Sequence, residues 1–506
     1  MSDLLRSPTQ TLAGRSRLIL ILLCAAQFSI SIDFSILNIA LPSLGADFGL
    51  SDASLQWGIT AFALPSGGFL LLAGRLGDLV GRRRMFLIGL TIFAAASLAA
   101  TLAIGPAMFF AARAVQGLGA AITIPTAMAL LTTSFAEGPA RDRALGISGM
   151  ILSLGFTLGM LLGGILTSAF GWRSTMALNV IMAVPVLIAA PRLLTESRPE
   201  HAPRLDLPGA ATVTGGLLAL IYSVSTAAQS GWNRPDVLIG LLLTITLFAA
   251  FVAVENRSRQ PLVSLQVLRR RTVAWGNLGG ITTFAMASSL TFLLTLYLQQ
   301  VIGLSPFSAG LVFGVTGLGA ASAGVVASRL INRFTARNVL IGGLLLQGVT
   351  TATMIMISGH RAGVVLVLIF CTIAFGGHMW AVVSYGVTAT SGLPNHEQGL
   401  ATGLLTTAQQ VGLTLGIPIL SAVYTAHSAS LRAAGQSAQQ AMLGGLHAGI
   451  VINAMVVVAV ALLIAVFLRV GTPHLATPDA GAGAPEAVIS PEPLITDRED
   501  YPTVAP

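Results

Sequence analysis

The chain has 506 residues, of which 54% are hydrophobic and only 9% are charged, with a mean hydropathy of +0.83. A soluble domain carries roughly a quarter charged residues, so this composition excludes a soluble globular protein and indicates a membrane protein. All 27 basic residues are arginines and the formal net charge is +8; in a membrane protein such an excess reports orientation, not nucleic-acid binding. The two cysteines, Cys24 and Cys371, lie in apolar runs and offer neither a disulfide framework nor a metal site.

Long apolar runs follow one another along the chain and predict membrane-spanning helices. Crossing a hydrocarbon core takes roughly 20 helical residues, and helices are favoured because every backbone polar group must be paired within the segment. The first run continues to Pro42 without a small-residue cleavage site, so we interpret it as a retained helix and not a signal peptide. Breaks at charged residues, Pro and Gly predict fourteen spans, at residues 18–42, 54–73, 85–104, 107–131, 144–168, 174–192, 208–228, 236–254, 273–299, 307–328, 339–358, 362–388, 399–424 and 445–468.

The arginines predict the orientation of these spans. With a cytoplasmic N-terminus, 22 arginines fall in inner segments and 4 in outer loops, while Arg113 alone lies within a span. By the positive-inside rule, both termini are predicted to be cytoplasmic. The segment 469–506 is rich in Pro, Ala, Gly and acids and is predicted to be a disordered tail.

One carboxylate interrupts the first span, in "SISIDFSILNIALP". Asp33 lies 16 residues beyond Arg17, about 24 Å along a helix, at a depth where a charge is costly and usually functional. In one interpretation Asp33, Arg113, Asn38 and Gln116 satisfy one another and hold two helices together. In the other, Asp33 gains and loses a proton during a transport cycle, as its surroundings change.

A second motif follows the second span, in "GRLGDLVGRRR", residues 74–84. A tight turn accounts for Gly77 and Gly81, and stop-transfer charges account for the arginines, but neither explains Asp78. The stretch resembles the loop between helices 2 and 3 of the major facilitator superfamily, whose pattern is G-x-L-a-D-r-x-G-r-r-r.

Three further stretches resemble one branch of that superfamily, the fourteen-helix drug:proton antiporters. "ARAVQGLGAA" (112–121) is similar to the fourth-helix signature R-x-x-Q-G of proton-coupled members, and "IDFSILNIALP" (32–42) to the first-helix pattern of the branch. "GFTLGMLLGG" (155–164) is similar to the exporter signature G-x-x-x-G-P-x-x-G-G, although Met160 replaces the proline. The resemblance covers about residues 18–468.

This resemblance implies an all-α membrane protein with the major facilitator fold, built from two pseudo-symmetric six-helix halves and two extra helices. The expected parts are a cytoplasmic N-terminal segment (1–17), an N-terminal half (18–192), a linker carrying the extra helices (193–272), a C-terminal half (273–468) and the tail (469–506). The run "GLTLGIPIL" (412–420) parallels the fifth helix and supports an internal repeat.

The implied function is proton-coupled antiport that exports hydrophobic drug-like or antibiotic molecules across the cytoplasmic membrane by alternating access. The protein is expected to be a monomer in the lipid bilayer, with protons and a hydrophobic small molecule as partners, no nucleic acid, no cofactor, no metal and no enzymatic activity. The absence of a P-loop and of any lysine excludes ATP-driven transport by this chain. A proton-coupled uptake carrier of the same fold and a non-transporting membrane sensor remain alternatives.

The resemblance also assigns roles to residues. Asp33 and Arg113 are expected to couple protons, and Asp78 to act as a cytoplasmic latch by engaging a helix N-terminus, with Gly74, Gly81, Arg82 and Arg83. Close packing at Gly155, Gly159, Gly163 and Gly164 is either a purely structural tight crossing of two helices or a smooth seam that lets the halves rock. His378 either lines a cavity or bonds a neighbouring carbonyl. The candidate substrate-cavity residues are Phe28, Phe34, Phe62, Gln116, Phe284, Phe292, Tyr297, His378, Trp380 and Tyr385.

Overall fold

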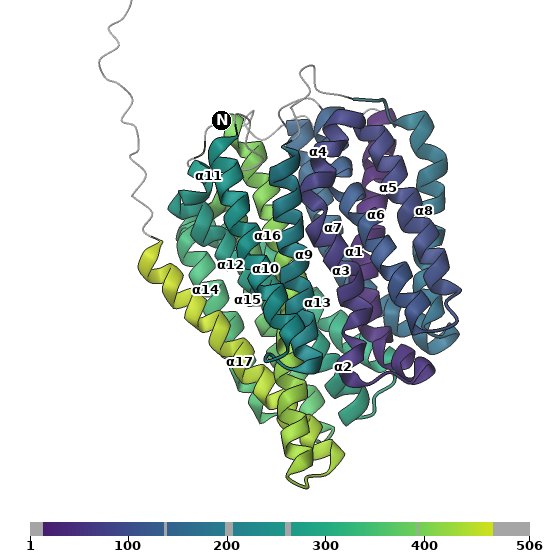
Figure 1. The fold of residues 1–506 in the computed structure, drawn as a ribbon, viewed down its shortest axis with the longest axis vertical. Coiled ribbons are helices and arrows are strands. Elements are labelled where there is room, and N and C mark those ends of the chain that lie inside the picture. The colour runs from purple at the N-terminus through teal and green to yellow at the C-terminus, as the bar shows by residue number, and fades with distance from the viewer. Residues whose placement is uncertain are drawn as a thin grey trace, which may run out of the picture. The chain divides into compact units, whose positions relative to one another are not determined.

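The computed structural model describes residues 14–135, 139–197, 206–258, 265–391, 393 and 395–468. Every regular element in these ranges is a helix, and the helices form a bundle with most of them running between the same two ends (Figure 1). The predicted tail and most of the predicted N-terminal segment lie outside the described residues. The all-α prediction is confirmed.

Each of the fourteen predicted spans overlaps one helix or several consecutive helices. The second span is a bent pair whose axes differ by 54°. The helices are α1 (Gly14–Phe48), α2 (Asp52–Leu55), α3 (Trp57–Gly68), α4 (Leu70–Val80), α5 (Arg82–Thr101), α6 (Pro106–Ser134), α7 (Pro139–Phe170), α8 (Arg173–Leu193), α9 (Leu207–Ser230), α10 (Pro235–Arg257), α11 (Leu265–Arg269), α12 (Arg271–Leu296), the π-helical η1 (Tyr297–Val301), α13 (Pro306–Arg333), α14 (Ala336–Thr353), the 3₁₀ turn η2 (Met354–Met356), α15 (Ala362–Thr390), α16 (Asn395–Ala433) and α17 (Ala438–Phe467).

Twelve of the described helices are long and apolar enough to cross a membrane, and the bent pair α3 and α4 would make a thirteenth. The remaining predicted span falls on α7, which is one continuous helix with a shorter apolar part at Leu154–Phe170. Fourteen spans are consistent with these helices and stay a prediction.

Helix packing repeats along the chain. In the first part, α1 packs on α6, α7 and α8, while α5 packs on α6 and α8, and α3 packs on α6. In the second part, α12 packs on α15, α16 and α17, while α14 packs on α15 and α17, and α13 packs on α15. The two sets of partners correspond one to one, as expected for two similar halves.

The two extra helices pack on each other, and α9 also packs on both halves. Helix α9 contacts α10, and on its other sides it contacts α3 and α16. Gln56, which lies just before α3, donates a hydrogen bond from Nε2 to the carbonyl of Ser225 in α9 at 3.3 Å. Helix α9 therefore covers the place where α3 and α16 meet.

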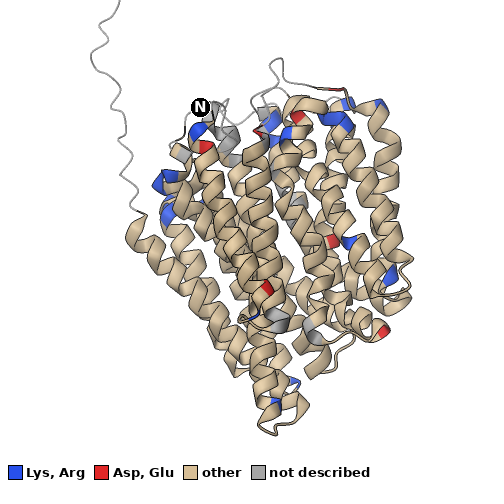
Figure 2. Cartoon of the chain, viewed as in Figure 1, with Lys and Arg blue, Asp and Glu red and all other residues tan. Residues whose placement is uncertain are grey.

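Basic side chains gather at one end of the bundle. Figure 2 shows most of the blue ribbon at the end where α4, α5 and α11 are labelled in Figure 1, and little at the opposite end. This distribution agrees with the predicted cytoplasmic side. The orientation itself stays a prediction.

Candidate functional site

The centre of the first half holds a fully buried ion pair. Asp33 in α1 and Arg113 in α6 both have 0% of their surface exposed. Arg113 Nη1 donates to Asp33 Oδ2 at 2.6 Å. The other carboxylate oxygen, Oδ1, accepts from Gln116 Nε2 at 2.9 Å and from Asn179 Nδ2 at 2.5 Å. Three donors thus face the two oxygens, which is the environment of an ionised carboxylate.

Arg113 is held by further acceptors around its guanidinium. Nε donates to the carbonyl of Gly58 at 3.1 Å, and Nη1 also reaches Gln116 Oε1 at 2.7 Å. The guanidinium carbon lies 4.5 Å from the centroid of the Phe62 ring, a cation–π contact. Gln116 Nε2 in turn donates to Ser97 Oγ at 2.8 Å. The network therefore joins α1, α3, α5, α6 and α8.

Sequence reasoning anticipated part of this network. The structure brings Asp33, Arg113 and Gln116 together, but the fourth expected partner was wrong, because Asn38 Nδ2 donates to the carbonyl of Phe34 in its own helix at 2.9 Å. Asn179 takes that place from α8 and was missed. Its signal in the sequence was an amide side chain inside an apolar span, which needs a buried partner.

The expected latch has a different partner from the one predicted. Asp78 Oδ1 accepts from Arg82 Nη2 at 2.9 Å and from Nε at 3.0 Å, one helical turn further along the chain. Among the described contacts, Asp78 engages no helix N-terminus. The predicted loop is also shorter than expected: Gly74 and Gly77 lie inside α4, and Gly81 alone, with φ +118°, turns the chain into α5.

Glu196 caps the N-terminus of α5. Its carboxylate accepts the backbone N–H of Arg83 at 3.0 Å and of Arg84 at 3.2 Å, at the start of α5. These N–H groups have no partner within the helix, and a carboxylate there also complements the helix dipole. Arg83 Nη2 donates to the carbonyl of Pro191 at 2.6 Å. The segment after α8 is thereby tied to the turn between α4 and α5.

The glycines of α7 face two different neighbours. Gly155, Gly159 and Gly163 pack on α1, where an added Cβ on Gly163 would lie 2.7 Å from the carbonyl of Ile36. These three glycines therefore make a tight helix crossing inside the first half, and their effect on rocking of the halves stays a prediction. Gly164 alone of the four faces α13, where an added Cβ would lie 2.6 Å from the carbonyl oxygen of Pro306.

We expect Gly164→Leu to destabilise the protein. The new side chain would overlap the backbone of α13, and overpacking of a tight contact costs about 1–3 kcal/mol. The thermal unfolding midpoint of the purified protein measures the effect. Gly146→Leu is the matched control, because Gly146 lies on the same helix with nothing within 4 Å of an added Cβ. Equal effects of both substitutions would contradict the assigned contact.

The candidate cavity residues divide into two groups. Phe34, Phe62, Gln116, Phe292, Tyr297 and Tyr385 are buried; Gln116 belongs to the ion-pair network, and the Tyr297 hydroxyl donates to the carbonyl of Ser358 at 2.7 Å. Their role in a substrate cavity stays a prediction. Phe28, Phe284 and Trp380 are partly exposed, although the Trp380 indole N–H donates to the carbonyl of Ala323 at 3.1 Å. His378 bonds the hydroxyl of Thr283.

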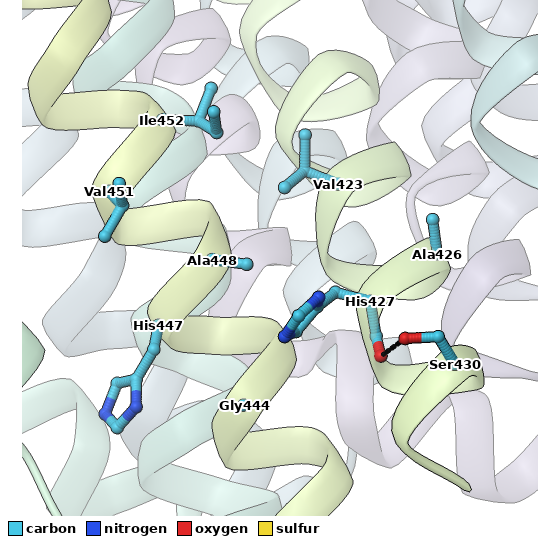
Figure 3. Close-up of a pocket in the computed structure, with 9 residues that line it drawn as sticks. All are labelled: Val423, Ala426, His427, Ser430, Gly444, His447, Ala448, Val451 and Ile452. Atoms are coloured by element: carbon cyan, nitrogen blue, oxygen red, sulfur yellow. Dashed lines mark hydrogen bonds between the residues drawn. The ribbon is translucent and has the colours of Figure 1, made fainter. Parts of the chain in front are cut away.

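A separate groove of about 730 Å³ lies between α16 and α17, away from the ion pair. Figure 3 shows His427 pointing from α16 towards α17, whereas the ring of His447 points away from α16. His447 Nε2 lies 2.9 Å from the carbonyl of Ile357. The remaining lining is mostly small and aliphatic: Val423, Ala426, Ser430, Gly444, Ala448, Val451 and Ile452.

The fold and the buried network define a multi-pass, all-helical membrane protein with two similarly packed halves. The chain belongs to the Major Facilitator Superfamily, whose sequence profile matches residues 23–417. It is 38% identical over 415 residues to the cephamycin export protein CmcT of Amycolatopsis lactamdurans, covering 80% of this chain and 84% of that protein. It is 36% identical over 451 residues to the puromycin resistance protein pur8 of Streptomyces alboniger, covering 88% and 89%.

Solved structures share the fold at low sequence identity. An auto-inhibited peptide transporter of the POT family superimposes with a TM-score of 0.67 at 16% identity, over 91% of this chain and 98% of that one. The human organic anion transporter MFSD10 (TETRAN) gives a TM-score of 0.56 at 17% identity, over 89% and 99%. At these identities the likeness concerns the fold alone.

Proposed function

We propose that the protein is a proton-coupled antiporter that exports hydrophobic drug-like or antibiotic molecules across the cytoplasmic membrane by alternating access. The observation that carries the proposal is the Asp33–Arg113 pair, a fully buried charge pair in the middle of a helical bundle. The export and resistance activities in the names of the two relatives support the direction and the kind of substrate.

The network gives protonation a structural consequence. A proton that binds Asp33 neutralises the carboxylate and leaves the Arg113 guanidinium without its counter-charge, and an uncompensated buried charge costs several kcal/mol. A free-energy change of about 5.5 kcal/mol is enough to invert a two-state population from 1:99 to 99:1. Because the network around the pair joins five helices, relief of that cost by rearrangement of the first half would change access to the site. Release of the proton then restores the geometry described here.

The proton step belongs to the first half alone. Asn179 donates to Asp33, and at the corresponding place Asn453 in α17 donates to the carbonyl of Met286 in α12 at 2.8 Å. Met286 thus stands where the first half has its carboxylate.

A contact between glycines identifies the residue of the second half that corresponds to Arg113. Gly119 packs on Gly89, and Gly377 packs in the same way on Gly343. Six residues before Gly119 is Arg113, and six before Gly377 is Cys371. The charge pair is therefore replaced by Met286 and Cys371, two uncharged side chains.

The proposal includes an arrangement in the membrane. Both termini are cytoplasmic, residues 18–192 and 273–468 are the two halves, and the linker 193–272 carries α9 and α10. The gathering of arginines at the end with α4, α5 and α11 (Figure 2) and the repeated packing of the two halves support this arrangement.

The direct test uses purified protein in liposomes with an imposed pH gradient and a panel of dyes and antibiotics. For the antiporter, we expect the compound to accumulate in the compartment that protons leave, and this accumulation should collapse with a protonophore. Accumulation in the compartment that protons enter would point to a proton-coupled uptake carrier. No gradient-dependent flux of any compound would favour a membrane sensor.

We expect Asp78→Asn to lower turnover per folded molecule while leaving stability nearly unchanged. Asp78 and Arg82 are partly exposed, with 25% and 19% of their side chains accessible, and such a pair contributes at most about 1 kcal/mol. Its proposed role is to hold the turn between α4 and α5 in one state of the cycle. Asp236→Asn, which breaks the exposed pair with Arg234, is the control. The measurement is the export rate divided by the amount of folded protein. If Asp78→Asn has the same rate as the control, Asp78 is not a latch.

A further inference from the structure

A second buried polar cluster lies in the C-terminal half. Thr283 in α12, Gln347 in α14 and His378 in α15 meet with Thr283 Oγ1 in the middle. The hydroxyl donates to Gln347 Oε1 at 2.7 Å and lies 2.8 Å from His378 Nδ1. Gln347 Nε2 donates to the backbone carbonyl of Thr283 at 3.4 Å. His378 is 5% exposed and the other two residues are as buried.

The hydrogen bonds assign the proton on the imidazole. Gln347 must present Oε1 to the hydroxyl, because only its Nε2 can donate to a carbonyl. The single hydroxyl hydrogen of Thr283 is then used on Gln347, so the hydroxyl oxygen can only accept from His378. Neutral His378 therefore carries its hydrogen on Nδ1.

This assignment leaves Nε2 as a bare acceptor. Among the described residues, no donor bonds Nε2. His378 keeps 5% of its surface exposed, so an acceptor left open in this way can take a donor from elsewhere. Phe284 and Phe375 stand edge-on beside the ring, with centroids 5.3 and 5.8 Å away. Phe284 is itself partly exposed, so one wall of the cluster is accessible.

The cluster lies at nearly the same depth in its half as the ion pair does in the first half. Thr283 lies three residues before Met286, which occupies the position of Asp33 in the second half. Three residues of helix span about 4.5 Å. The polar groups of the second half therefore lie within one turn of the level at which the first half holds its ion pair.

We propose that His378 Nε2 is a substrate-binding acceptor that recognises an N–H or O–H donor on an otherwise hydrophobic molecule. The inference rests on the proposed transport function and adds a substrate class to it. In this division of roles the first half carries the proton, and the second half binds the cargo through one directed hydrogen bond between aromatic edges. Thr283 and Gln347 are positioning residues, because they fix which nitrogen is bare.

Equilibrium binding of two triarylmethane dyes to the purified full-length protein tests the proposal. Pararosaniline carries N–H donors, whereas crystal violet has the same cationic skeleton with every amine fully methylated. We expect His378→Leu to weaken pararosaniline binding about tenfold, which corresponds to about 1.4 kcal/mol, and to change crystal violet binding by less than twofold. His447→Leu, at a histidine outside the cluster, should change neither. Thr283→Val should weaken pararosaniline selectively, though less than His378→Leu.

Three results would overturn the proposal. Equal weakening of both dyes by His378→Leu would make the histidine a packing residue, and no change for either dye would remove it from the site. A ring ¹⁵N spectrum of the wild-type protein, assigned by subtraction of the His378→Gln spectrum, must show the hydrogen on Nδ1; a hydrogen on Nε2 would also overturn the proposal, whether or not a dye binds. Dye transport that follows the pH gradient without donor discrimination would leave the proposed function standing and remove only this inference.

Discussion

Export driven by a pH gradient should fall to the level of protein-free vesicles when Asp33 is replaced by Asn. The amide keeps the size of the side chain and can still accept a hydrogen bond from Arg113, but it cannot take up or release a proton. The Arg113 guanidinium would then face an uncharged side chain throughout the cycle. Vesicles with an imposed pH gradient and a fluorescent cationic dye measure the rate, and binding of the same dye should persist.

Asp47→Asn provides the control on the same helix. Asp47 Oδ2 accepts from Arg173 at 2.7 Å and from the Trp172 indole at 3.0 Å, but its side chain is 44% exposed. Such an exposed pair contributes at most about 1 kcal/mol, so export should be close to that of the wild type. If Asp33→Asn retained full proton-driven export, Asp33 could not be the coupling group.

The sequence alone placed the helices well and placed their contacts less well. Apolar runs about 20 residues long fix a membrane helix because the bilayer sets its length, and the predicted spans all overlap helices. Which side of a helix meets which neighbour depends on rotation about its axis, and a run that is apolar all round does not encode that rotation. Asn179 reaches Asp33 across 146 positions of the chain, and no local pattern indicates the contact.

Two motifs illustrate this limit. The four-residue spacing of Gly155, Gly159 and Gly163 places them on one face of a helix, but the spacing does not indicate that the neighbour they face is α1. Asp78 was correctly singled out from the turn, but Glu196, more than one hundred residues later, holds the N-terminus of α5. In both cases the residue type and its spacing could be interpreted from the sequence, but the distant residue that it contacts could not be predicted. The Thr283, Gln347 and His378 cluster belongs to the same class, because it joins three helices.

Arg113→Met should destabilise the protein more than any other substitution discussed above, and adding Asp33→Asn should restore most of the loss. Arg113→Met leaves a buried carboxylate with only two amide donors, and loss of one partner of a buried ion pair costs about 3–5 kcal/mol. The double variant removes both charges, and an uncharged pair in such a site is often as stable as the ion pair it replaces. Thermal unfolding of the four proteins in the same detergent completes the cycle.

The double variant also separates the two roles that the sequence left open for the pair. If Asp33 and Arg113 only hold helices together, the recovered protein should export as the wild type does. If Asp33 carries the proton, the double variant should be folded and bind dye, yet show no export that depends on the pH gradient. A double variant as unstable as Arg113→Met alone would mean that the two side chains are not energetically coupled, and the distance of 2.6 Å between them would then have no thermodynamic counterpart.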